Sequence, residues 1–129
     1  MPIAGTTATT HLPFPELLKA HRDQLAEMPG WRGVMSREEA EELLQGKSPL
    51  TYVVRDVGEA DAFELSWVMK TGAIKHRDAR LIENPSTGSR YWKNHTVESF
   101  LNPVTADENA LLELFSKMME CDPNQMRPA

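Results

Sequence analysis

The sequence predicts an α+β fold, in which a central antiparallel β-sheet lies between α-helices. Three patterns lead to this fold: helical periodicity near the start, alternating apolar strands over 51–78, and a second helical pattern over 106–120. A helix, a three-stranded meander and a further helix form a layered arrangement with the sheet between helices. With 129 residues, the chain has the length of one compact domain.

The first part of the chain predicts two helices behind a flexible tail. Residues 1–12 are mostly small and polar, as in a loose N-terminal tail. Residues 13–28 predict a helix that packs on the domain, and Pro29-Gly30 ends it. A second helix begins at Ser36, which forms a capping box with Glu39, and Gly46 closes it. The apolar stripe of the first helix consists of Leu17, Leu18, His21, Leu25 and Met28.

The middle and the end of the chain predict strands followed by a helix. Residues 51–57 predict a central strand that is apolar on both faces, and residues 62–70 and 73–78 predict a hairpin. Residues 90–92 predict a short edge strand. Asp107 is the expected N-cap of the last helix over 106–120, whose buried stripe consists of Leu111, Leu114, Phe115 and Met118.

Arg55 is the most informative residue, because it lies inside the apolar strand Tyr52-Val53-Val54-Arg55-Asp56-Val57. Side chains alternate along a strand, so Arg55 shares a face with two valines. A guanidinium there keeps its proton and needs an anion to compensate its charge. That anion is either a carboxylate of this chain, the usual partner of a buried arginine, or it belongs to a ligand.

The composition excludes several classes of protein. The net charge of −5 argues against a general nucleic-acid binder, which would carry a basic face. Cys121 is the only cysteine, so no intrachain disulfide and no cysteine-based zinc site can form, and a reducing compartment fits. Residues 1–11 lack the basic start and apolar core of a secretion signal, and no stretch has transmembrane length. We therefore expect a cytoplasmic monomer that binds neither nucleic acid nor membrane and holds no cofactor or metal.

Four segments together resemble a known family. Trp31-Arg32-Gly33-Val34-Met35-Ser36-Arg37-Glu38-Glu39-Ala40-Glu41-Glu42-Leu43-Leu44 is similar to the opening of the Src homology 2 domain, and Thr51-Tyr52-Val53-Val54-Arg55-Asp56 resembles its central-strand signature. Phe63-Glu64-Leu65-Ser66 and Ile74-Lys75-His76 resemble its next two strands, and residues 111–118 its second helix. The resemblance implies a Src homology 2-like domain over 31–122, with an extra N-terminal helix over 13–30, an insertion at about 92–107 and a C-terminal tail over 123–129.

The resemblance implies a non-catalytic module that binds tyrosine-phosphorylated peptides or proteins. The resemblance implies that Arg55 forms the floor of the phosphate pocket, that Arg37 closes over the phosphate and the ring, and that His76 lies beside the phosphotyrosine. The alternative for His76 is a packed structural histidine. The loop over 56–61 wraps the phosphate. The predicted phosphotyrosine-binding residues are Arg37, Arg55, Asp56, Val57, Gly58, Ser66, His76 and Arg77. Bacterial effectors that act in a host cytosol also carry this module, so such an origin is one interpretation.

Several positions depart from the family pattern. Val57 replaces a serine that donates to the phosphate, and Asp78 replaces a lysine that flanks the ring. Arg77 either reaches the phosphate pocket through a local bulge or lies on the opposite face and shapes the peptide groove. The insertion, with His95, and Lys75 are predicted to line the peptide groove. Trp92 of the insertion either contacts the peptide there or covers a small apolar cluster. We expect the insertion to reduce selectivity for residues after the phosphotyrosine.

Two other functions are alternatives to phosphotyrosine binding. Cys121 and Arg127 have the spacing of cysteine-dependent phosphatases, but the segment lacks the glycine-rich phosphate loop that those enzymes need. A scaffolding domain with an inactive pocket would show no phosphate-dependent binding. The phosphate hypothesis would be wrong if a carboxylate of the chain neutralised Arg55 with no opening to solvent.

Overall fold

The computed structural model describes residues 12–94, 99–100 and 107–129. Within them the chain forms a seven-stranded sheet, three α-helices and one short 3-10 helix. The elements in chain order are α2 (Phe14–Ala26), β1 (Trp31–Val34), α3 (Arg37–Leu44), β2 (Thr51–Asp56), β3 (Ala62–Val68), β4 (Ile74–Glu83), β5 (Arg90–Lys93), β6 (Ser99–Phe100), α4 (Glu108–Met119), η1 (Pro123–Gln125) and β7 (Arg127–Pro128).

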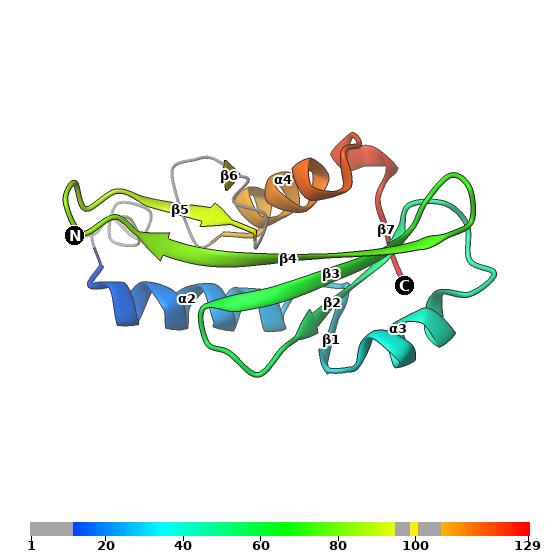
Figure 1. The fold of residues 1–129 in the computed structure, drawn as a ribbon, viewed down its shortest axis with the longest axis horizontal. Coiled ribbons are helices and arrows are strands. Elements are labelled where there is room, and N and C mark those ends of the chain that lie inside the picture. Colours follow the sequence, from blue (N-terminus) through cyan, green and yellow to red (C-terminus); the bar gives the residue numbers. More distant parts are fainter. Residues whose placement is uncertain (1–11, 95–98, 101–106) are drawn as a thin grey trace.

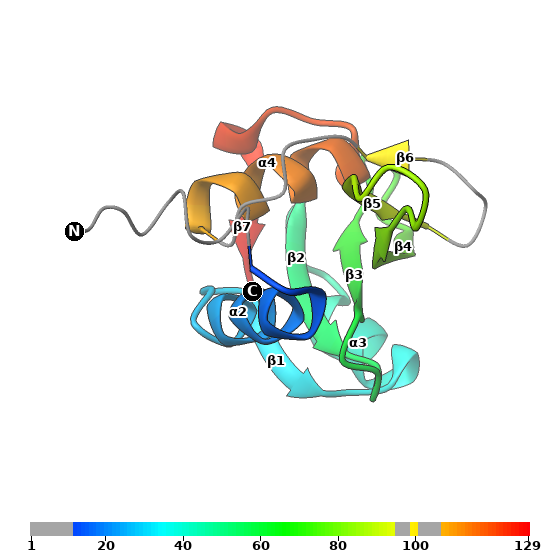
Figure 2. The same cartoon turned by 90° about the vertical axis from the view of Figure 1, so that its left-hand side faces the viewer.

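The sheet has the strand order β1-β2-β3-β4-β5-β6, and β7 also pairs with β2. The strands from β2 to β6 are antiparallel to their neighbours, whereas β1 and β7 run parallel to β2. In Figure 1, α4 lies above the long strand β4, and α2 and α3 lie below it. Figure 2 shows β2 and β3 between α4 at the top and α3 at the bottom, and α2 packs at one end of the sheet in the same apolar cluster as α4. The predicted α+β fold, an antiparallel sheet flanked by helices, is confirmed.

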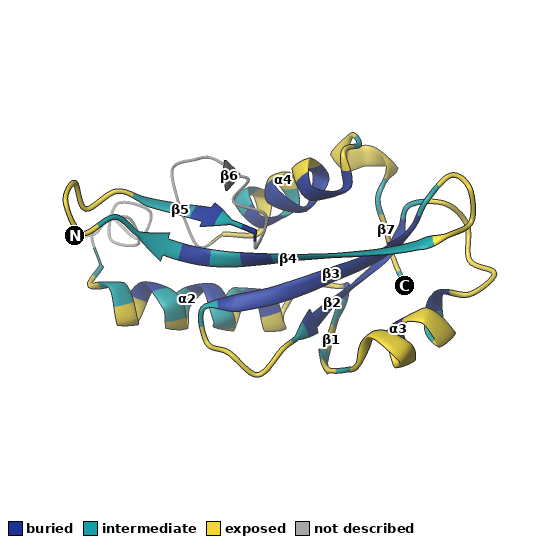
Figure 3. Cartoon of the chain, in the orientation of Figure 1, coloured by how far each residue is buried: buried dark blue, intermediate teal, exposed yellow. Residues whose placement is uncertain are grey.

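Two apolar clusters hold the layers together. The larger cluster joins α2 and α4 to one face of the sheet and includes Phe63, Leu65, Trp67 and Phe115. The smaller cluster joins α3 to the other face through Ala40, Leu44, Val53 and Val68. Both faces of β2 and β3 are therefore covered, and Figure 3 shows these strands buried while much of α3 is exposed. Any polar side chain on β2 or β3 must find its partners inside the protein.

The helix α2 is an integral part of the larger cluster. Leu17, Leu25 and the following Met28 are almost fully buried in it. His21 is 2% exposed, and its ring meets the edge of Trp92 at a centroid distance of 5.2 Å. Neither ring nitrogen has a hydrogen-bond partner among the described residues. Burial lowers the pKa of His21 to about 4, although the charge of Asp107 acts in the opposite direction.

Some element boundaries differ from the sequence predictions. The strand predicted over 73–78 extends to Glu83, because Ala79 and Leu81 continue the buried alternation. The strand near residue 90 is not at the edge, since β6 pairs beyond it. The segment 123–129, predicted as a tail, forms η1 and β7, and the backbone N–H of Ala129 donates to Tyr52 at 2.9 Å. Short parallel pairing of this kind has no turn signal in the sequence.

Candidate functional site

Arg55 lies in a row of charged residues that crosses three strands. It is directly opposite Glu64 on β3, and Glu64 is directly opposite Asp78 on β4. In the neighbouring row, Ser66 on β3 is opposite His76 on β4. Paired residues of antiparallel strands point to the same face, so these five side chains share the α3 side of the sheet. We call Arg37 of α3 together with Arg55, Glu64, Ser66 and His76 the Arg55 site.

Every nitrogen of the Arg55 guanidinium donates to an acceptor of the chain. Nε donates to Ser66 Oγ at 3.0 Å, Nη1 donates to the backbone carbonyl of Met35 at 2.9 Å, and Nη2 donates to Oε1 of Glu64. Arg55 is 3% exposed and Glu64 is 7% exposed. The anion that compensates Arg55 in this structure is therefore a carboxylate of the chain itself.

Glu64 is shared with Arg37, the first residue of α3. Arg37 Nε donates to Oε1 of Glu64 at 2.9 Å and Nη2 donates to Oε2 at 3.0 Å, which is the bidentate geometry of an arginine–carboxylate pair. The predicted capping box of Ser36 and Glu39 is present and fixes the start of α3, and so the place of Arg37. Burial, followed by the charge of Arg37, lowers the pKa of Arg55. One carboxylate thus serves two cations.

The site reaches solvent through Arg37 of α3. The side chain of Arg37 is 58% exposed, whereas that of Arg55 is 3% exposed. A carboxylate of the chain neutralises Arg55, so the first half of the condition that would exclude a phosphate is met. Arg55 itself has almost no contact with solvent, and Arg37 is the member of the site that an incoming anion would meet first.

A hydrogen-bonded chain continues from Arg55 to α3. Because Ser66 Oγ accepts from Arg55 Nε, its own proton is left for Nδ1 of His76, which lies 2.7 Å away. His76 Nε2 lies 2.7 Å from Oε2 of Glu41, one turn after Arg37 on α3. A proton on Nε2 of His76 that is donated to Glu41, with Nδ1 as the acceptor, is compatible with both contacts. Arg37 and Glu41 therefore attach the exposed helix α3 to the sheet at two points.

The loop over 56–61 does not contact the Arg55 guanidinium in this structure. Asp56 accepts a hydrogen bond from the backbone N–H of Gly58 at 2.8 Å and lies 3.4 Å from the guanidinium of Arg22 on α2. Val57 is 39% exposed. Further along the loop, Glu59 and Asp61 accept hydrogen bonds from Arg80 of β4. Asp56, Val57 and Gly58 were predicted to wrap a phosphate, and here two arginines outside the site hold this loop.

Arg77 lies on the sheet face opposite to Arg55. The predicted alternative in which a local bulge turns Arg77 toward the Arg55 site is therefore not adopted. It donates to the backbone carbonyl of Met118 at 2.8 Å and lies 3.5 Å from the carboxylate of Glu120. Among the described residues β4 has no bulge that would turn Arg77, because its pairing with β3 is continuous. Strand alternation therefore places Arg77 beside the end of α4, away from the Arg55 site.

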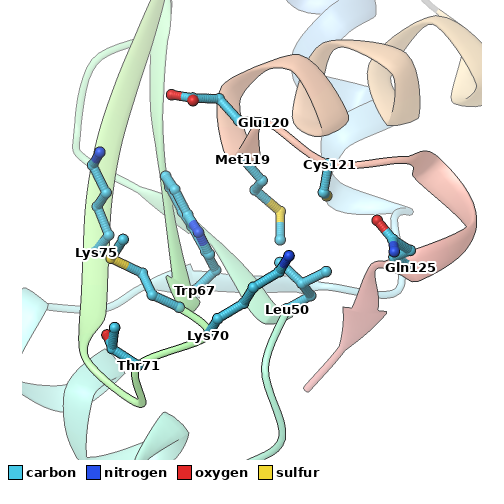
Figure 4. A pocket seen from close by; sticks show the side chains of 10 residues that line it. Leu50, Trp67, Lys70, Thr71, Lys75, Met119, Glu120, Cys121 and Gln125 are labelled. Carbon is cyan, nitrogen blue, oxygen red and sulfur yellow. The ribbon is translucent and has the colours of Figure 1, made fainter.

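Lys75 shares the face of Arg77 and lines a cavity of about 280 Å³. Figure 4 shows the cavity between the β3–β4 hairpin, the end of α4 and the segment that follows it. Its lining is apolar at Leu50, Trp67, Met69 and Met119, and polar at Lys70, Thr71, Lys75, Glu120, Cys121 and Gln125. The cavity and the Arg55 site lie on opposite faces of the sheet.

Of the two insertion residues considered for the groove, only Trp92 lies among the described residues. Trp92 is 6% exposed and lies in the larger apolar cluster, where its ring contacts Phe63 and His21. Of the two alternatives for Trp92, the structure shows packing in an apolar cluster and not exposure toward a groove, because β5 turns the large ring toward α2. His95 lies outside the described residues.

The cysteine near the C-terminus has no features of an activated nucleophile. Cys121 is half-buried, and burial, together with Asp122, raises the pKa of its thiol. A nucleophilic cysteine needs the opposite shift. Arg127 pairs with Thr51 in β7 and is exposed. Within the described residues no group of three metal-ligating side chains occurs, and no helix is both long and apolar enough to cross a bilayer.

Glu64 is the residue of the site that the sequence analysis did not single out. A glutamate between Phe63 and Leu65 in an apolar strand is a signal of the same kind as Arg55. Alternation alone places Glu64 on the face of β3 opposite to Phe63 and Leu65. Their contact also requires the register of β2 and β3, which the exposed loop between them leaves open.

Comparisons with known proteins agree with the resemblance seen in the sequence. A family model described as the SH2 domain matches residues 31–101, more than half of the chain. The solution structure of the SH2 domain of human proto-oncogene protein VAV1 is 21% identical, with 72% of this chain and 59% of that chain covered and a TM-score of 0.46. The SH2 domain of a Monosiga brevicollis CRK/CRKL homolog is 20% identical, with 71% and 77% covered and a TM-score of 0.47.

A further match is the VAV1 SH2 domain in complex with a tyrosine-phosphorylated peptide from SLP76, at 21% identity and a TM-score of 0.45, with 72% of this chain and 59% of that chain covered. The chain thus spans less than two thirds of the VAV1 chains that it matches. No curated protein matches it. The family match covers every residue of the Arg55 site.

Proposed function

The chain belongs to the SH2 domain family, and on that premise we propose that its Arg55 site binds phosphotyrosine in peptides or proteins, without catalysis. The observation that carries the proposal is the convergence of Arg37 and Arg55 on one oxyanion. Both guanidinium groups donate to the carboxylate of Glu64, and Arg37 does so with two parallel hydrogen bonds. Two cations aimed at one acceptor group form a site for an anion.

A phosphate fits this arrangement better than a carboxylate does. A phosphomonoester carries a charge of about −1.5 to −2 and three acceptor oxygens, so it can accept from both guanidinium groups at once. Planar guanidinium groups match two phosphate oxygens each. Arg55 Nη2 donates to the most buried oxygen and Arg37 closes the site from the exposed side. The long phenolic arm of tyrosine would carry a phosphate to that depth.

The bound peptide crosses β4 next to His76 and continues toward the α4 side of the sheet. His76 lies beside the phenolic ring and is oriented by Ser66 and Glu41. On the far side, the peptide reaches Arg77 and the cavity lined by Lys75. These two cations favour acidic residues after the phosphotyrosine. Weak selectivity at the third residue after the phosphotyrosine is part of the proposal.

Calorimetric titration with a tyrosine peptide in phosphorylated and unphosphorylated form tests the proposal. The wild-type chain binds only the phosphorylated form, and Arg55→Ala abolishes that binding. Arg80→Ala is the matched control, because it removes an arginine from the same face that is engaged by Glu59 and Asp61. Equal binding of both peptide forms, or equal losses in the two variants, would refute the proposal.

A scaffolding domain with an inactive pocket is the second candidate. The observation in its favour is the carboxylate of Glu64, which already occupies both arginines. This candidate predicts no heat of binding with the phosphorylated peptide for the wild-type chain. The partner class under the first candidate is a tyrosine-phosphorylated protein of the cytoplasm, bound by a monomeric chain.

A further inference from the structure

We propose that Glu64 is an internal competitor of the phosphate, so that phosphotyrosine binds only by displacing this carboxylate from Arg37 and Arg55. The inference rests on the proposed function and names Glu64 as the residue that sets the affinity of the Arg55 site for phosphotyrosine. Glu64 accepts hydrogen bonds from Arg37 at 2.9 and 3.0 Å and from Nη2 of Arg55. These are the donors that the phosphate needs.

The two anions exclude each other on these donors. Nε of Arg55 is engaged by Ser66 and Nη1 by the carbonyl of Met35, so Nη2 is the nitrogen through which an incoming anion is held. Glu64 is 7% exposed and occupies the interior beside Nη2. Phosphate and carboxylate in contact would repel each other strongly in this poorly solvated place.

The charges around the site determine how strongly Glu64 reduces the attraction for a phosphate. Arg37 and Arg55 supply two positive charges, and Glu64 removes one of them while it is bound. Glu41 contacts His76 from α3, and Asp78 pairs in register with Glu64 on β4. With Glu64 in place, one of the two positive charges that would attract a dianion is already compensated. Once Glu64 has swung out toward the exposed mouth beside Arg37, both arginines are available.

Competition of this kind lowers the affinity for phosphotyrosine, and it also makes the site selective for phosphotyrosine over other anions. An incoming aspartate or glutamate side chain gains the same two partners that Glu64 loses, so the exchange gives it no advantage. A phosphomonoester dianion brings a second charge and a third acceptor oxygen. The carboxylate of Glu64 therefore makes the site discriminate between phosphotyrosine and acidic side chains.

The test compares Glu64→Ala and Glu64→Gln with the wild-type chain in titrations of the matched phosphorylated and unphosphorylated peptides. Both variants are expected to bind the phosphorylated peptide more tightly, by about tenfold or more for Glu64→Ala, because a desolvated like charge beside the phosphate is gone. Glu42→Ala is the matched control, since it removes one exposed carboxylate from α3 and leaves the affinity unchanged. Thermal unfolding with and without inorganic phosphate gives a second readout, in which phosphate stabilises the Glu64 variants more than the wild type.

The outcomes separate this inference from the function on which it rests. If the wild type binds the phosphorylated peptide and the folded Glu64 variants bind equally or more weakly, Glu64 positions the arginines and the competitor is refuted, while the proposed function stands. If neither the wild type nor any Glu64 variant binds, both ideas fail. If the variants bind and the wild type does not, Glu64 closes the site by itself and the competitor is supported. If neither variant folds, the fold requires Glu64 in place, and the proposal that this carboxylate leaves the two arginines when phosphate binds is also refuted.

Discussion

The buried ring of His21 predicts that acid destabilises the domain through α2. Burial lowers its pKa to about 4 in the folded chain, whereas an unfolded histidine titrates near 6.5. A group whose folded pKa is lowered stabilises the fold fully above the unfolded pKa. That contribution is lost as the pH falls from about 6.5 toward 4, because the unfolded chain then binds a proton that the folded chain does not.

The size of the effect follows from the two pKa values. The difference of about 2.5 units corresponds to at most about 3 kcal/mol, and about 2 kcal/mol of this is lost by pH 5. Domains of this size are stabilised by roughly 5–15 kcal/mol, so the loss is a large share of the total. The structural cause is that both ring nitrogens lack hydrogen-bond partners among the described residues and Trp92 covers the ring.

Urea unfolding of the wild type and of His21→Leu at pH 7 and pH 5 measures this contribution. Leucine keeps the apolar contacts and cannot bind a proton, so the wild type should lose about 2 kcal/mol more than the variant between the two pH values. The variant corrects for carboxylates that titrate in the same range. Parallel losses in the two proteins would refute the reasoning and would mean that His21 is not buried under Trp92.

Three further predictions follow from other contacts. Arg55→Ala should weaken binding of a phosphorylated peptide by at least about 2 kcal/mol, as at a central interface residue, and a calorimetric loss of a few tenths of a kcal/mol would contradict its role. Gly30→Ala should destabilise the domain by about 1–3 kcal/mol in urea, because a Cβ there would lie 2.6 Å from the ring of Tyr52, and an unchanged midpoint would show that the ring moves freely. Neither the wild type nor Cys121→Ser should hydrolyse p-nitrophenyl phosphate faster than buffer does, since burial raises the pKa of the thiol. Hydrolysis by the wild type that disappears in Cys121→Ser would support the phosphatase alternative.

Local signals in the sequence predicted most of the fold. The capping box of Ser36 and Glu39 and the N-cap Asp107 mark the helix starts that the structure shows. Alternation identified the strands and the face of Arg55. These features depend on neighbouring residues, which is why one sequence suffices to find them.

Features that depend on tertiary contacts were missed. Glu64 meets Arg55 only because of the register between β2 and β3, and Trp92 enters the core only because α2 covers it. The pairing of β7 with β2 joins residues more than seventy positions apart. For Arg77 the sequence left two alternatives, and the continuous pairing of β4 places this residue on the sheet face opposite to Arg55. Register and long-range packing are set by the whole chain, so local patterns do not determine them.

The most direct test of phosphate recognition is to record the side-chain ¹⁵N–¹H NMR signals of Arg55 while a phosphorylated tyrosine peptide is added. The account predicts that the Nε and Nη signals of Arg55 shift as the peptide binds, and that the unphosphorylated peptide leaves them in place. Saturable binding of the phosphorylated peptide with unchanged Arg55 signals would contradict the account, because the phosphate would then lie elsewhere.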